Sequence, residues 1–195
     1  MTITIHPSEP ITGSDARDEI SVSEPVSTVE EKNIELQKHL ESVEYIDDKT
    51  QFLMFGIEQG DYALDILRVR EILDIPPITK VPRTPDFMLG VINLRGSVVP
   101  VVDLRQRFGM EQADYTEKSC IIIVEIEGNG SKARVFGLSV DAVQEVISLS
   151  PDMINEVSKV GTNIDTNFLK GVGNYMENFV LIMDLAKVLP VNESF

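Results

Sequence analysis

The sequence predicts a mainly β fold in which two small β-barrels pack on each other behind an acidic N-terminal tail. Three observations lead to this prediction. From about residue 50 to residue 190, short apolar runs alternate with turn-forming Gly, Pro, Asn and Asp, which is typical of short strands. A series of about five strands occurs twice, with a period of roughly 75 to 80 residues. One run, Ser97–Leu104, is apolar on both faces, which indicates a strand at the centre of a core.

The composition excludes several classes of partner. Hydrophobic residues make up 43% of the chain, as in an ordinary globular protein, and the formal net charge is −15. We expect no nucleic-acid partner, because phosphate binding requires a basic face, and the same charge disfavours binding to anionic lipid. We find no secretory signal and no apolar run long enough for direct membrane insertion. Cys120 is the single cysteine, so no internal disulfide forms and a cytoplasmic setting is expected.

The first 49 residues are interpreted as a tail that carries roughly half of the net negative charge. Residues 1–26 are rich in Ser, Thr, Pro and acidic residues. They lack the apolar side chains that would offset the entropy of ordering, so we predict that they are disordered.

A helix is possible over residues 28–46, with Ser27 or Thr28 as its cap. Four apolar residues recur there at helical spacing: Val29, Leu36, Leu40 and Val43. The apolar stripe is narrow, so two interpretations stay open. The segment is either a partly formed helix within the tail or a helix that docks on the body or on a partner.

The body, residues 50–190, is expected to begin with a first barrel over about residues 52–110. The expected elements of this copy are strands over 52–58, 62–66 and 67–75, an extended connector over 78–85, one helical turn over 85–89 and a central hairpin over 89–105. The hairpin turns at Arg95-Gly96, where Gly96 supplies the left-handed conformation of a tight turn. Pro100 cannot donate a ladder hydrogen bond and is expected at an edge or a bulge. Asp103 is expected to cap a short helix.

The second barrel is expected over about residues 119–189, because the pattern restarts after a polar linker. The segment GLSVDAVQEVI from Gly137 matches ALDILRVREIL from Ala63, and GVGNYMENFVLIMDL from Gly171 matches GVINLRGSVVPVVDL from Gly90. Neither copy alone buries much apolar surface, so the two should share a core.

The duplication separates residues that serve the fold from residues that are free to serve function. Asp103 recurs as Asp184, and both are expected to cap helices. Glu71 recurs as Glu145, whereas Arg95 is replaced by Met176. Arg95, at the apex of the hairpin, is therefore the strongest candidate for a functional residue, and Glu71 is its expected ion-pair partner across neighbouring strands. The alternative interpretation of Arg95 is a solvated turn residue.

The residues give no indication of an enzyme, a cofactor or a metal site. Neither His6 nor His39 lies in the body, and Cys120 begins an apolar strand, where a core role is expected. Nucleophile-elbow, phosphate-loop and zinc-protease motifs are missing from the sequence.

Three phrases of the body resemble the CheW family, the adaptors that couple chemoreceptors to the histidine kinase CheA. They are YALDILRVREIL, GVINLRGSVVPVVDLR, and GLSVDAVQEVISL followed by the GVGNY hairpin. The resemblance runs from about Phe52 to Leu189. It implies a CheW-like fold of two packed SH3-like five-stranded β-barrels.

The resemblance also implies a non-enzymatic chemotaxis scaffold that is cytoplasmic and recruited to membrane receptor arrays. Its implied partners are the cytoplasmic tip of a chemoreceptor and the regulatory domain of CheA. By motif, the implied receptor- or kinase-binding residues are Val69, Glu71, Gly90, Arg95 and Val146. Gly90 has an alternative interpretation as a backbone requirement, and Val146 as a core residue.

Two other functions stay open at this point. One is a CheW-like scaffold in another kinase pathway, such as twitching or another form of motility. The other is a small-ligand-binding or catalytic β-barrel that uses its Asp and Glu residues.

Overall fold

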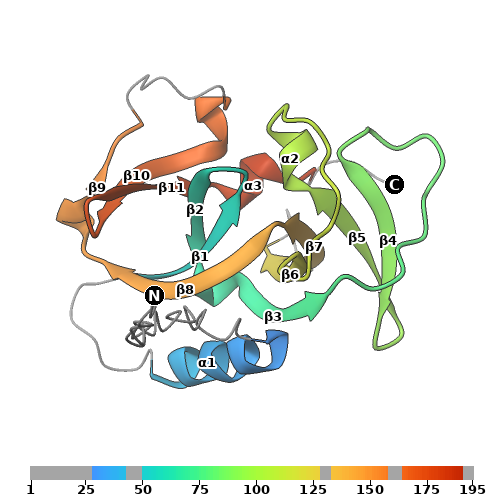
Figure 1. The fold of residues 1–195 in the computed structure, drawn as a ribbon, viewed down its shortest axis with the longest axis horizontal. Helices are drawn as coiled ribbons and strands as arrows, with labels where there is room; N and C mark the ends of the chain where they lie inside the picture. Colours follow the sequence, from blue (N-terminus) through green and yellow to red (C-terminus); the bar gives the residue numbers. More distant parts are fainter. Residues whose placement is uncertain (1–27, 43–49, 128–132, 158–163, 191–195) are drawn as a thin grey trace, which may run out of the picture.

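A computed structural model describes residues 28–42, 50–127, 133–157 and 164–190. These residues form two β-sheets that pack side by side, with one long helix along their outer side (Figure 1). The residues expected to be disordered, 1–26, lie outside the described part of the chain. Within the described ranges no helix is both long and apolar enough to cross a bilayer.

Sheet A has six strands in the order β8-β1-β2-β11-β10-β9, and sheet B has five in the order β3-β6-β7-β5-β4. The strands of sheet A are β1 (Thr50–Ile57), β2 (Gly60–Asp65), β8 (Ala142–Leu149), β9 (Ile154–Asn155), β10 (Leu169–Tyr175) and β11 (Asn178–Met183). Those of sheet B are β3 (Val69–Asp74), β4 (Met88–Leu94), β5 (Ser97–Asp103), β6 (Cys120–Ile126) and β7 (Arg134–Val140). The helices are α1 (Val29–Ser42), α2 (Leu104–Arg107) and α3 (Leu185–Val188), and the 3-10 turns are η2 (Ile66–Arg68), η3 (Pro151–Met153) and η4 (Thr166–Phe168). The predicted mainly β class with two packed SH3-like barrels is confirmed, and sheet A adds the two-residue strand β9 to the five strands expected.

Each sheet combines strands from both copies of the repeat. β1 and β2 of the first copy lie in sheet A with β8, β10 and β11, while β6 and β7 of the second copy lie in sheet B with β3, β4 and β5. The orders β8-β1-β2-β11-β10 and β3-β6-β7-β5-β4 are the same when each strand is replaced by its equivalent in the other copy. The duplication in the sequence is therefore also present in the topology. The predicted division into a barrel over 52–110 and a barrel over 119–189 does not follow the sheets, because two hairpins are exchanged.

The two copies can exchange hairpins because equivalent strands of the two copies make equivalent pairings. The pairing of β1 with β8 is equivalent to the pairing of β6 with β3, and the parallel pairing of β2 with β11 is equivalent to that of β7 with β5. A hydrophobic pattern present in both copies specifies which strands pair, but it does not specify which copy supplies the partner.

The expected shared core is present. The largest cluster of buried side chains includes Phe55 and Tyr62 of sheet A and Phe136 of sheet B. Aromatic rings continue this core toward the short helices: Tyr62 stacks between Phe55 and Phe108, with centroid separations of 5.9 and 5.5 Å, and Phe108 meets Phe168 at 5.9 Å. The two sheets therefore form one folded body.

The strand β5 is buried on both faces, as predicted, except at its start. Val99 and Val101 pack in one cluster, and Val102 packs in the main core on the other side. Val98 is 73% exposed near the hairpin tip, where neither face is covered.

Pro100 lies in an interior strand, at a place where its missing N–H does no harm. It faces Val91, whose own N–H and C=O bond to Thr79 and so point away from β5. Positions 91 and 100 are thus a non-hydrogen-bonded pair, and the nitrogen of Pro100 points toward β7. Pairing with β7 begins only at Val101.

Local signals placed most turns and caps correctly. Arg95 and Gly96 both have positive φ, 52° and 87°, as a two-residue type I′ turn requires. The Asp103 carboxylate accepts hydrogen bonds from the N–H groups that begin α2, and Asp184 does the same for α3. The helical turn expected over 85–89 is absent. The chain instead makes a non-helical turn, in which the Met88 N–H donates to the Pro85 carbonyl, and β4 begins at Met88.

Candidate functional site

The ion pair of Glu71 and Arg95 joins the two ends of sheet B. Arg95 Nη2 lies 2.9 Å from Glu71 Oε2. Glu71 is on β3, the first strand in the sheet order, and Arg95 is in the turn that follows β4, the last strand. The expected pairing is confirmed, but it spans the seam where the curved sheet closes and not two neighbouring strands. The Arg95 side chain is 80% exposed, so its charge is presented to solvent.

The second copy has a related contact without a cation. The Tyr175 hydroxyl donates to Glu145 Oε2 at 3.1 Å, between the end strands β10 and β8 of the five strands that repeat. Partial burial, and then the neighbouring Glu145 carboxylate, raise the pKa of Tyr175. In each sheet a duplicated glutamate thus joins the two end strands of the repeat. Of these two contacts, the one in sheet B presents a guanidinium, and the one in sheet A does not.

Gly90 has a structural role. Its φ is +140°, and a Cβ there would lie 2.1 Å from the Thr79 carbonyl oxygen. Thr79 crosses β4 at this point and exchanges two backbone hydrogen bonds with Val91. The close approach of two backbones requires glycine. Gly90 is buried, so any effect of this residue on binding acts through the shape of β4.

The two candidate valines lie on β3 and β8, in different sheets. Val69 is 4% exposed and belongs to the main core, while Val146 is half-buried and packs against the same core. Of the five candidate residues, the structure brings Glu71 and Arg95 into contact. It places Val69 and Val146 on one side of the body and makes Gly90 part of the scaffold.

One element of this region was left open by the sequence: α1 docks on the body. It contacts both β3 and β8 and lies along the side of the body that these strands form (Figure 1). Leu36 is 1% exposed and belongs to the main core, against which Val29 and Leu40 also pack. Three of the four residues of the predicted apolar stripe pack on the body, and Val43, like residues 44–46 of the predicted helix, lies outside the described residues. The docking interpretation is correct for the described part of the helix.

Exposed apolar side chains mark the tips of the equivalent hairpins β4–β5 and β10–β11. Val98 and Phe179 occupy equivalent positions and are 73% and 71% exposed, and Met176, the counterpart of Arg95, is 75% exposed. Phe179 lines a largely apolar groove of about 540 Å³ formed by the β1–β2 turn, β9, β10 and β11. These positions are suited to contacts with another protein. Sequence reasoning missed them, because a strand-tip valine resembles a core valine.

Among the described residues, Cys120 is buried in the fold and Asp103 caps a helix. No group of three or more His, Cys, Asp or Glu side chains able to hold a metal ion occurs in the described part of the chain. Burial raises the pKa of the Cys120 thiol to about 11, so it is protonated at neutral pH and a poor nucleophile. Asp103 is engaged as a helix cap.

Comparisons with known proteins agree with this geometry. Residues 51–193 match the CheW-like domain family. The chain is 34% identical over 143 residues to the chemotaxis protein CheW of Klebsiella aerogenes, which covers 73% of this chain and 83% of that protein. It is 33% identical to the chemotaxis protein CheW of Rhizobium meliloti, over 73% of this chain and 89% of that protein.

The crystal structure of the scaffolding protein TtCheW from Thermoanaerobacter tengcongensis superposes with a TM-score of 0.67. That alignment has 38% identity and covers 76% of this chain and 93% of that chain. The chain described here belongs to the CheW family of non-enzymatic chemotaxis adaptor proteins.

Proposed function

We propose that this protein couples the cytoplasmic tips of chemoreceptors to the regulatory domain of the histidine kinase CheA, in the cytoplasm at membrane receptor arrays. The observation that carries the proposal is the Glu71–Arg95 pair. In a chain of net charge −15, it presents a guanidinium at an exposed hairpin apex and anchors it with a half-buried carboxylate. Such an arrangement contributes little stability but sets the register of a partner through charge complementarity.

The candidate residues divide into two groups under this proposal. Arg95 and Glu71 form a contact patch at the end of sheet B, and the exposed Val98 lies on the same hairpin as Arg95. Val69 and Val146 shape the face of β3 and β8, where an apolar helix of a receptor bundle would bind. Gly90 keeps β4 in position beneath the patch.

The direct test is co-sedimentation with receptor-containing membranes, with and without CheA. We expect Arg95→Glu to lower the amount of protein retained by at least about tenfold when CheA is present. The melting temperature should move by less than about 2 °C, since the side chain is 80% exposed.

Arg83→Glu is the matched control. Arg83 is also exposed and also has a positive φ, 65° against 52° at Arg95, so the two substitutions change charge and backbone preference in the same way. Wild-type retention is expected for this variant. Equal retention of both variants would contradict the role of Arg95. Capture of a histidine kinase other than CheA would assign the protein to another kinase pathway.

A further inference from the structure

The helix α1 lies outside the region that matches the family, residues 51–193, yet it is built into the body. Its start is specified by a capping box. The Thr28 hydroxyl accepts from the Glu31 N–H at 3.2 Å, and the Thr28 N–H donates to Glu31 Oε2 at 2.9 Å. The chain therefore specifies this helix locally, in addition to the docking that holds it.

Asn33 attaches α1 to the free edge of β3. Its side-chain amide accepts from the Ile72 N–H at 2.8 Å and donates to the Ile72 carbonyl at 2.7 Å. β3 is the end strand of sheet B, so its outer N–H and C=O groups have no strand partner in the sheet order. Asn33 supplies the hydrogen bonds that a neighbouring strand would have made at this residue.

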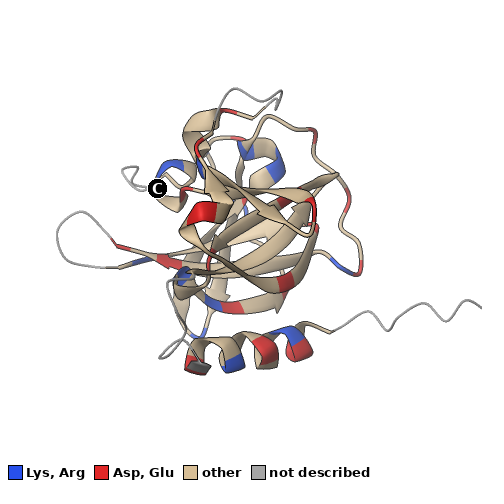
Figure 2. Ribbon diagram, turned by 90° about the vertical axis from the view of Figure 1, so that its left-hand side faces the viewer, with Lys and Arg blue, Asp and Glu red and all other residues tan. Residues whose placement is uncertain are grey.

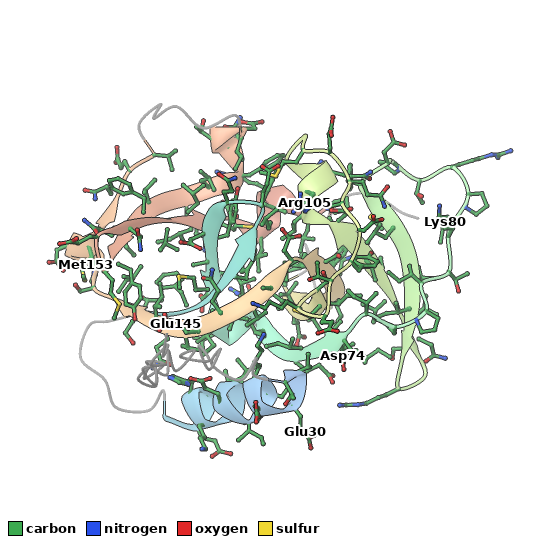
Figure 3. All side chains as sticks on the ribbon, viewed as in Figure 1. Glu30, Asp74, Lys80, Arg105, Glu145 and Met153 are labelled. Atoms are coloured by element: carbon green, nitrogen blue, oxygen red, sulfur yellow. The ribbon has the colours of Figure 1, made fainter. Side chains whose placement is uncertain are left out.

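The opposite face of α1 is polar. Acidic and basic residues alternate along the helix in Figure 2, and Glu30 points away from the body in Figure 3. The exposed outer positions are Glu30, Glu31, Ile34, Glu35, Gln37, Lys38 and Glu41. The apolar anchors Val29, Leu36 and Leu40 therefore recur at helical spacing on the docked side, which is the recognition pattern of a helix in a groove.

The face that α1 covers is the one assigned above to a receptor helix. Val69 and Glu71 are on β3 and Val146 is on β8, and α1 packs on both strands. On β3 the helix is anchored at Ile72, one residue after Glu71 and three after Val69. A second helix cannot occupy this volume while α1 is docked.

We propose that α1 is an intramolecular competitor for the helix-binding face of β3 and β8, and that a partner helix binds there only after α1 leaves. The inference rests on the proposed function and adds its regulation. Because α1 holds the face in the closed state, the apparent affinity for a partner helix is reduced by the fraction of molecules that are open. Substitutions that loosen α1 therefore strengthen binding in trans.

The first experiment uses the full chain and a fluorescent synthetic peptide of residues 27–42 as the probe. In the doubly substituted Asn33→Ala, Leu36→Ala chain, the peptide should bind at least about tenfold more tightly than in the wild type, because the peptide retains the side chains that the chain has lost. Ile34→Ala is the matched control, an apolar truncation on the same helix at a side chain that is 52% exposed and is not part of the buried core. It should behave as the wild type does.

Circular dichroism and the melting temperature confirm that each variant is folded. Asn33→Ala alone, which removes no buried apolar group, keeps the test available if the double variant unfolds, with a smaller gain expected. No binding of the peptide to any folded variant would overturn the proposal. A dimer that exchanges α1 between copies, detected by light scattering, would overturn its intramolecular form.

The second experiment repeats co-sedimentation with receptor-containing membranes. The double variant should be retained more strongly than the wild type. The Ile34→Ala variant should be retained to the same extent as the wild type. If the wild type and the double variant are retained equally, α1 does not compete with the receptor. The proposal of competition is then wrong, while the proposed adaptor function stands. If neither is retained, the proposed function fails and the competition fails with it, whatever the peptide result.

Discussion

Arg105 and Asp141 lie in different copies of the repeat, and their side chains form a two-point contact between them. Arg105 Nε donates to Asp141 Oδ1 at 2.8 Å, and Arg105 Nη2 donates to Asp141 Oδ2 at 2.5 Å. Asp141 Oδ2 also accepts from the Glu58 N–H at 2.6 Å. One carboxylate thus ties together α2, the β1–β2 turn and the segment that joins β7 to β8.

Removal of this contact should destabilise the protein. We expect Arg105→Ala to lower the free energy of unfolding by about 1–3 kcal/mol, because it leaves a partly buried carboxylate with one backbone donor. Asp141 is 34% exposed, which keeps the loss below that of a fully buried pair. Urea denaturation measures it. Lys187→Ala, which removes a 57% exposed lysine from its pair with Asp184, is the control and should change little. A similar loss in both variants would contradict the prediction.

The same pair predicts a component of acid sensitivity. Burial alone would raise the pKa of Asp141, but hydrogen bonds from Arg105 and from the Glu58 N–H outweigh it and hold the pKa below its ordinary value of 3.8. A carboxylate with a lowered folded pKa contributes stability above pH 3.8 and loses it as the pH falls through the folded pKa. We expect the melting-temperature difference between wild type and Asp141→Asn to shrink below about pH 4. A difference independent of pH between 7 and 3 would exclude this contribution of Asp141.

Gly90 and Gly96 should respond differently to the same substitution. Gly90→Ala places a Cβ 2.1 Å from the Thr79 carbonyl oxygen, so we expect a loss of more than about 2 kcal/mol in the free energy of unfolding. Gly96→Ala meets no atom within 4 Å and should cost about 1 kcal/mol, from its positive φ alone. Thermal denaturation distinguishes them. Wild-type stability in Gly90→Ala would return this residue to the group of direct binding residues.

Arg107 holds the two short helices together. Its guanidinium lies 4.5 Å from the Phe87 ring centroid and 4.8 Å from that of Phe168, and its Nε donates to the Val188 carbonyl at 2.6 Å, at the end of α3. We expect Arg107→Ala to cost about 2 kcal/mol and Arg107→Lys to recover only part of it, because lysine lacks the planar fork. Full stability in the lysine variant would show that charge alone is sufficient.

Local chemistry made much of the fold predictable. The Arg95-Gly96 turn and the Asp103 and Asp184 caps follow from backbone and side-chain preferences within a few residues, and the structure has all three. Pairing of Glu71 with Arg95 was also predictable, because the duplication isolates Arg95 as the residue that differs.

The features that the sequence did not predict depend on contacts between distant segments. The exchange of hairpins between the copies leaves the local hydrophobic pattern of each strand unchanged. The sequence pattern therefore cannot predict it. Docking of α1 depends on Leu36 and on the pairing of Asn33 with the edge of β3, and a single asparagine on a helix gives no signal of a partner 39 positions away. The apolar pattern wrongly predicted that Val98 is buried, because apolar character alone does not distinguish a residue at a hairpin tip from a residue in the core.

The exchanged hairpins also order events during synthesis. Within the body β1 and β2 are synthesised first, but their neighbours in sheet A are β8 and β11, which follow β6 and β7 in the chain. The earliest part of the body to be made is thus the part that waits longest for its permanent partners, with the aromatic rings of Phe55 and Tyr62 uncovered in the meantime.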